Sequence, residues 1–261
     1  MYYLAVLRVL FGVNLLNELQ YRVNFAVQLV QSAISLGTAL LGLAVIFSHT
    51  RTLGGWSPEE LVVLLGIYSI MAGFMGAVIG PSLSRLMQDV RDGTLDFTLT
   101  KPVASQFLVS FRQIVIWRLA DVLLGGALVF GGTVRLGERI GVLQAASFAV
   151  TLVAAAVIVY SFRLVLATLT FWIIRVENIM VIWSSLFEAG RYPVGLYPEW
   201  LRMVLTLVVP VAFATTVPAE ALAGRLNPTV LAAALALAAL SLGIASAFWR
   251  YGLRHYTGAS A

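Results

Sequence analysis

The segment RLMQDVRDGTLDFTLTKPVASQFLVSFR, residues 85–112, separates two long apolar runs of the chain. Within 13 positions it holds five charged residues: Asp89, Arg91, Asp92, Asp96 and Lys101. Charged residues make up only 11% of the whole chain. The hydrocarbon core of a bilayer does not accept such a density of charge, because each charge is costly to bury where water is absent. We therefore expect this segment to lie in water on one side of a membrane, where it can contact a soluble partner.

The overall composition is that of a membrane protein. Of the 261 residues 60% are hydrophobic, and the mean hydropathy is +0.93. A soluble domain of this size leaves much of its surface in water and cannot hide so many apolar side chains. Several apolar runs approach or exceed the ~20 residues that a helix needs to cross ~30 Å of hydrocarbon. The sequence therefore predicts an all-α polytopic membrane protein.

Six spans are predicted from the apolar runs, within a single transmembrane domain that covers residues 1–261. The spans are residues 25–47, 61–80, 113–134, 144–173, 178–188 and 229–249. Residues 1–22 carry apolar side chains at helical spacing, with polar side chains largely elsewhere. This pattern favours an amphipathic helix that lies in the membrane interface. Ser57 is a candidate N-cap for the second span, with Glu60 three residues later completing a capping box.

Two segments between the spans have distinct characters. Residues 82–112 form the charged loop, which we place in the cytoplasm. Residues 189–228 are expected to form a pair of short re-entrant helices on the outer side, because prolines interrupt helices repeatedly there. These prolines are Pro193, Pro198, Pro210, Pro218 and Pro228. With both termini inside, nine Lys or Arg residues lie on the cytoplasmic side and six outside, a bias that supports this orientation modestly.

The boundary between the fourth and fifth spans has two possible positions. The apolar tract 142–174 is too long for one upright span and too short for two. A turn at 175–178 leaves Arg163 inside the fourth span. The alternative places the turn at Arg163 and leaves Arg175 and Glu177 inside the fifth span. We prefer the first interpretation, since a charge inside a span costs ~2.5–3.5 kcal/mol on insertion scales and burying one costs less than burying two.

Several classes of function are disfavoured by residue content. The net charge is +5, but the arginines lie singly near span ends, which is typical of topology signals and predicts no nucleic-acid partner. There is no cysteine, and His49 and His255 lack metal-ligand spacing, so no metal site is predicted. No carboxylate pair or nucleophile–base set indicates an enzyme. A phosphate-binding loop ends in Gly-Lys-[Ser/Thr], whereas the only lysine, Lys101, precedes a proline.

A few polar residues fall within the predicted spans. Arg118 and Asp121 are three residues apart on the third span and can pair with each other or line a pore. Arg163 can face a pore or contact another subunit. These three are our candidates for a translocation path. Polar residues of the first span and glycines of the second are explained more simply by helix packing; they are Gln28, Gln31, Ser32 and Ser35, and Gly73, Gly76 and Gly80.

The charged loop resembles that of a known family. Its sequence VRDGTLDFTLTKPVASQFLVSFR is similar to the pattern R-x-G-T-L-D-x-x-L-x-K-P of ABC-transporter permeases of the type-2 exporter superfamily, in the bacterial branch with subunits of this length. The matching residues are Arg91, Gly93, Thr94, Leu95, Asp96, Leu99, Lys101 and Pro102. Three further features also resemble this class: the proline-rich stretch 192–222, the turn 175–178 where relatives place Arg-Asp, and the ending GLRHYTGAS at 252–260.

The resemblance implies a permease subunit of an ATP-driven exporter in the bacterial cell (inner or plasma) membrane, with both termini cytoplasmic. Two permease subunits, identical or related, would form the translocation path within membrane lipid. Two cytoplasmic ABC ATPase subunits would carry ATP and Mg²⁺, and this chain would hold no cofactor. In this class the loop after span two contributes a coupling helix that docks in the ATPase, and the turn between spans four and five makes a smaller contact.

Carried over position by position, the resemblance implies two sets of ATPase-coupling residues. The main set is Asp89, Arg91, Asp92, Gly93, Thr94, Leu95, Asp96, Lys101 and Pro102, and the secondary set is Arg175, Glu177 and Asn178. The alternative function is an ion-coupled secondary transporter. That class uses acidic residues deep in its spans and helix breaks at the midplane. Only Asp121 fits this description, and the predicted breaks lie near the outer face. The sequence indicates no particular substrate.

Overall fold

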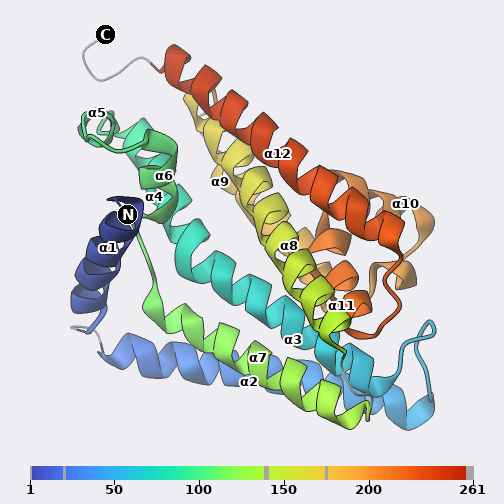
Figure 1. The fold of residues 1–261 in the computed structure, drawn as a ribbon. Helices are drawn as coiled ribbons and strands as arrows, with labels where there is room; N and C mark the ends of the chain where they lie inside the picture. Colours follow the sequence, from blue (N-terminus) through green and yellow to red (C-terminus); the bar gives the residue numbers. More distant parts are fainter. Residues whose placement is uncertain (1, 20–21, 138–140, 174–175, 257–261) are drawn as a thin grey trace.

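The computed structural model of the chain describes residues 2–19, 22–137, 141–173 and 176–256, and these fold into a bundle of helices without a strand (Figure 1). The α-helices are α1 (Tyr2–Leu19), α2 (Arg22–His49), α3 (Pro58–Phe74), α4 (Gly80–Arg91), α5 (Asp96–Leu99), α6 (Ser105–Phe111), α7 (Leu119–Arg135), α8 (Val142–Thr168), α9 (Glu177–Glu188), α10 (Glu199–Met203), α11 (Val217–Leu222) and α12 (Pro228–His255).

Within the described residues, five helical segments are long and apolar enough to cross a membrane. They are Ala26–His49, Pro58–Arg91, Ile116–Arg135, Val142–Phe171 and Pro228–His255. The bent pair Glu199–Val208 and Ala212–Leu222, whose axes differ by 77°, makes a sixth only if it counts as one span. The predicted fifth span corresponds to α9, whose 12 residues extend only about 18 Å and reach part of the way through a bilayer.

The second span is longer than the predicted 61–80. α3, a π-helical turn at Met75–Ile79 and α4 form one helical segment of 34 residues, Pro58–Arg91. Pro81 does not end it, because this proline lies in the first turn of α4, where a missing N–H is tolerated. At 1.5 Å per residue the segment extends about 51 Å, well beyond ~30 Å of hydrocarbon. Its α4 end therefore carries the charged loop away from the apolar part of the bundle.

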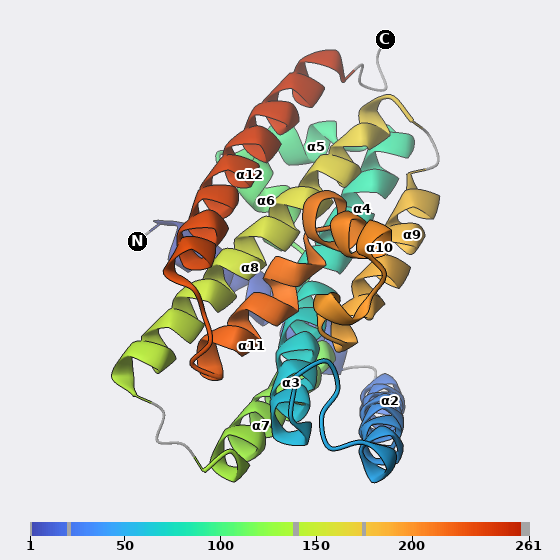
Figure 2. The ribbon, with the colours of Figure 1, turned by 90° about the vertical axis from the view of Figure 1, so that its right-hand side faces the viewer.

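α3 and α7 pack together through glycines. A Cβ added to Gly125 would lie 2.5 Å from the carbonyl oxygen of Gly66, and one added to Gly73 would lie 2.9 Å from the backbone nitrogen of Val122. Only glycine permits such a close approach of two helix backbones. The packing interpretation of Gly73 is therefore confirmed. Figure 2 shows α3 and α7 between α2, which stands apart, and the α8–α12 pair.

The chain does not turn at Arg163, because α8 is helical without a break from Val142 to Thr168. The turn between α8 and α9 falls between Phe171 and Glu177. In the proline-rich region the chain bends at 209–211, where Pro210 separates the two helical pieces that differ by 77°. The expected break in this region is thus present.

One end of the bundle gathers the charged loop, the start of α1 and the end of α12 (Figure 1). α1 runs across the direction of the long helices, beside α6. Its Tyr2 hydroxyl donates to the carbonyl oxygen of Pro102 at 3.1 Å, and the Asn14 amide donates to that of Arg112 at 3.1 Å. The Tyr3 and Phe107 rings contact edge to face, with centroids 4.9 Å apart. The N-terminal helix is therefore docked on the segment that closes the charged loop.

Candidate functional site

The charged turn, residues 92–104, reverses the chain between α4 and α6. Asp92 donates its backbone N–H to the carbonyl oxygen of Gln88 at 2.9 Å, and Thr94 donates to that of Asp89 at 2.8 Å. Gly93 has φ +67°, a conformation that residues with a Cβ rarely adopt. The chain therefore turns at Asp92-Gly93-Thr94, and the short helix α5 follows directly.

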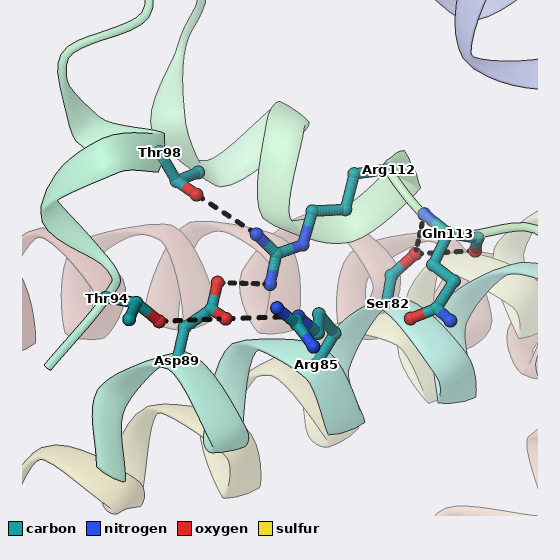
Figure 3. Close-up of polar contacts among 7 residues, drawn as sticks. All are labelled: Ser82, Arg85, Asp89, Thr94, Thr98, Arg112 and Gln113. Atoms are coloured by element: carbon teal, nitrogen blue, oxygen red, sulfur yellow. Dashed lines mark hydrogen bonds and ion pairs between the residues drawn. The ribbon is translucent and has the colours of Figure 1, made fainter. Parts of the chain in front are cut away.

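Asp89 lies beneath the charged turn and is only 3% exposed (Figure 3). Its carboxylate accepts a hydrogen bond from Arg112 Nη2 at 2.5 Å and another from Thr94 Oγ1 at 3.2 Å. Arg85 Nε lies 3.1 Å from the same carboxylate, one helical turn away on α4. Arg112 also donates from Nη1 to Thr98 Oγ1 at 3.0 Å. We call these five side chains the Asp89 cluster; it joins α4, α5 and the end of α6.

The segment after α6 is fastened to the long second span. Ser82 Oγ donates to the carbonyl oxygen of Gln113 at 2.8 Å and lies 3.1 Å from its backbone nitrogen, which donates in return (Figure 3). The carbonyl oxygen of Ala77, within the π-helical turn, accepts the backbone N–H of Val115 at 2.7 Å. α6 is also tied to α12, because Gln106 donates to Ser246 Oγ at 3.0 Å and the Trp249 indole donates to Ser105 Oγ at 3.3 Å. These hydrogen bonds connect the segment that follows the charged turn to the second span and to α12.

The predicted coupling residues differ in where their side chains point. Asp89 and Leu95 are buried, so the expected direct contact of these two with an ATPase does not fit their position; they hold the turn together instead. The exposed members are Arg91, Asp92, Lys101 and Pro102, and the partly exposed ones are Gly93, Thr94 and Asp96. In the secondary set, Arg175 and the side chain of Glu177 lie outside the described part of the chain, and Asn178 is exposed at the start of α9.

Phe97 is a residue of this surface that sequence reasoning missed. It lies on α5 between the partly exposed Asp96 and the buried Thr98, and 75% of it is exposed. The ring is thus exposed on α5, a helix that lies at one end of the bundle (Figure 1). Its only sequence signal was an aromatic residue in a highly polar segment. Aromatic residues are among those that anchor protein interfaces.

A second site is a polar cavity of about 310 Å³ among α2, α3, α7 and the end of α9. Arg118 and Asp121 line it, with Arg118 Nη1 3.5 Å from Asp121 Oδ2. Glu188 and Arg191 contribute the other charged groups, and Tyr68 lies among them. The remaining polar lining comes from Gln31, Ser32, Ser35 and Ser69. We call this the membrane cavity.

The three candidates for a translocation path are thus divided. Arg118 and Asp121 lie together in the membrane cavity, and they also form the expected pair. Arg163 is not among the cavity residues; its guanidinium lies over the Trp183 ring, 4.8 Å from the centroid, and near Gly80. Sequence reasoning missed Glu188 and Arg191, because they lie about 70 residues from Arg118. It also assigned the polar side of the first span to packing, although Gln31, Ser32 and Ser35 face the cavity.

Comparison with known proteins identifies the family. A family model described as "ABC-2 family transporter protein" matches residues 33–260, nearly the whole chain. The chain belongs to the ABC-2 transporter family. Neither a curated protein nor a solved structure matches it significantly. The matched region includes the Asp89 cluster, the charged turn and most residues of the membrane cavity.

This ABC-2 family member is therefore a multi-pass membrane protein and a permease subunit of an ABC transporter. Such a subunit is generally not catalytic itself. The two sites of this ABC-2 permease are thus a charged surface at one end of the bundle and a polar cavity among helices that include the membrane-crossing ones.

Proposed function

We propose that this ABC-2 permease is the membrane subunit of an ATP-driven exporter, and that it is coupled through the charged turn to a separate cytoplasmic ATPase. Two permease subunits, identical or related, form the translocation path, and two ABC ATPase subunits bind ATP with Mg²⁺. In this proposal the protein lies in a bacterial inner membrane, with the charged turn and both termini in the cytoplasm. The observation that carries the proposal is the rigid, charged turn with Phe97 at its surface, in a chain of the ABC-2 family.

The Asp89 cluster, built around a buried carboxylate, supports this role for the turn. A surface that receives force must keep its shape, and the ion pair of Asp89 with Arg112 holds α4, α5 and α6 as one unit. The long second span then acts as a lever between the turn and the membrane cavity. From Asp92 to Ser69 it covers 23 residues, about 35 Å at 1.5 Å per residue. The π-helical turn Met75–Ile79 lies between these two points and is a site where the lever can bend.

We assign Phe97 the role of anchor in the ATPase contact. A ring that is three-quarters exposed gains by leaving water, and aromatic residues are among the common hot spots of protein interfaces. The exposed charges around it, Asp92 and Lys101, would set orientation and partner choice more than affinity. In this proposal Phe97 provides most of the affinity, and the exposed charges provide recognition of the partner.

The test is co-purification of the full-length permease with an ATPase, followed by ATP-dependent transport in vesicles. Phe97→Ala is expected to weaken ATPase binding about tenfold or more, because truncating a hot spot costs ≥ 2 kcal/mol. Phe130→Ala is the matched control, since Phe130 is also an exposed phenylalanine, 71% against 75%, but lies on the membrane-crossing α7.

Three results would contradict the proposal: no ATPase in the purified complex, equal effects of the two substitutions, or transport that an ion gradient drives without ATP. The last result would support the ion-coupled alternative.

A further inference from the structure

The membrane cavity combines two positive and two negative side chains. Arg118 ends the 3₁₀ turn before α7 and Asp121 lies in the first turn of α7, while Glu188 and Arg191 come from the end of α9 and the turn after it. All four line one cavity of about 310 Å³, which Tyr68 also lines. The formal charge of this lining is zero, but both signs are present.

These charged groups do not satisfy one another. The single contact of Arg118 Nη1 with Asp121 Oδ2 is 3.5 Å, well beyond the ~2.7–2.9 Å of a charge-assisted hydrogen bond. Arg191 Nε is buried without a hydrogen-bond partner, and its guanidinium lies over the Tyr68 ring, 5.2 Å from the centroid. Among the described residues, no ion pair within 4 Å involves Glu188. Arg118, Asp121 and Glu188 thus keep hydrogen-bonding capacity toward the cavity, while the Arg191 guanidinium is engaged by Tyr68 and contributes its charge.

The charge pattern selects among classes of solute. A solute with only a positive group would meet two repelling guanidinium groups, and one with only a negative group would meet two repelling carboxylates. An apolar solute would strip water from four charged groups and return no hydrogen bond. A solute that carries both charges can pair with a carboxylate and a guanidinium at once.

We propose that the membrane cavity binds a small zwitterion, an organic solute with one cationic and one anionic group, as the transported substrate; this rests on the proposed function of the chain as a permease. The volume lies at the lower end of the ~300–1,000 Å³ typical of small-molecule sites, so the solute is small rather than a lipid or a peptide. The hydroxyl groups of Ser32 and Ser35 are available to its uncharged polar atoms, whereas that of Ser69 donates to the carbonyl oxygen of Leu65 at 2.9 Å.

Binding to the full-length permease in nanodiscs, without an ATPase, tests this directly. The probe is ¹⁴C-labelled glycine betaine, measured by scintillation proximity. Its unlabelled competitors have nearly the same shape but different charge: choline is a cation, 3,3-dimethylbutanoate an anion and 3,3-dimethyl-1-butanol neutral. We expect saturable binding of glycine betaine, with each of the other three competing at least about tenfold more weakly, as the loss of one charge-assisted contact implies.

Charge-changing variants give a readout that a purely structural role would not produce. Asp121→Asn leaves the lining with a net positive charge, so binding of glycine betaine should fall about tenfold while 3,3-dimethylbutanoate becomes the better competitor. Arg191→Gln should shift the preference toward choline. Glu199→Gln and Arg202→Gln are matched controls, because this pair has the same i,i+3 spacing but lies outside the cavity. Both controls should leave the order of competitors unchanged.

Three outcomes would overturn the assignment: no saturable binding of glycine betaine, equal competition by the singly charged analogues, or variants that weaken all solutes alike. Size-exclusion profiles identify any variant that fails to fold, and the two cavity variants act in opposite directions, so one folded variant suffices. Because no ATPase is present, failure here is distinct from failure of the proposed coupling, which co-purification reports.

Discussion

Replacing Asp89 by asparagine should loosen the charged turn while leaving the membrane-crossing helices intact. The substitution keeps the size of the side chain and an oxygen that can accept from Thr94, but removes the only negative charge of the Asp89 cluster. Arg112, whose side chain is 17% exposed, then remains as a largely buried cation. Removing one partner of a buried ion pair costs about 3–5 kcal/mol. The lower end applies, because the amide oxygen retains part of the hydrogen bonding.

A loss of about 3 kcal/mol corresponds to a change of about 100-fold in the equilibrium between the closed and open turn. Amide hydrogen exchange measures this equilibrium segment by segment. In Asp89→Asn, amides of residues 94–111 should therefore exchange up to about 100-fold faster, whereas those in the middle of α12 should be unchanged. ATP-dependent transport should fall in parallel, because the coupling surface loses its fixed shape.

Two controls make this prediction specific. Arg85→Gln removes the other cation of the cluster, but its side chain is 55% exposed, and such a pair contributes only about 0–1 kcal/mol. Exchange should then change less than about fivefold. The double variant Asp89→Asn, Arg112→Gln should recover part of the loss, since no unpaired buried charge remains. Unchanged exchange in Asp89→Asn, or an equal effect of Arg85→Gln, would refute the reasoning.

Two further predictions concern packing and pH. Gly125→Ala places a Cβ 2.5 Å from the carbonyl oxygen of Gly66, so it should lower the free energy of unfolding by about 1–3 kcal/mol and the unfolding temperature with it. In the control Gly126→Ala the new Cβ meets nothing within 4 Å, so this variant should be neutral or slightly stabilising. Equal thermal shifts would disprove the close approach of α3 and α7. Burial raises the pKa of the Glu18 carboxyl on α1, because the docked position of the helix disfavours the ionised form. The docked state of α1 therefore becomes less stable as pH rises through the titration range of this carboxyl. Hydrogen exchange of α1 should therefore speed up with pH beyond the intrinsic dependence, and Glu18→Gln should abolish this excess; an excess that persists in the variant would exclude Glu18 as its source.

Features that depend on local chemistry could be predicted from the sequence. The capping box of Ser57 and Glu60 is present, with the Glu60 backbone donating to Ser57 Oγ at 3.3 Å and the Ser57 backbone donating to Glu60 Oε2 at 2.8 Å. The Arg118–Asp121 pair is present as well. Each involves residues within a few positions of one another, where backbone geometry alone determines which groups meet.

The helical, membrane-crossing character and the position of the charged turn follow from the sequence alone, because hydropathy and backbone hydrogen bonding permit little else in a bilayer. Only the tertiary structure turns Asp89 inward and Phe97 outward, and only it brings Glu188 and Arg191 to the cavity of Arg118. Periodicity tells which residues share a face of one helix, but the neighbour of that face is chosen by packing with helices far away in the chain. Arg112 reaches Asp89 across 23 residues, and no local pattern encodes that contact.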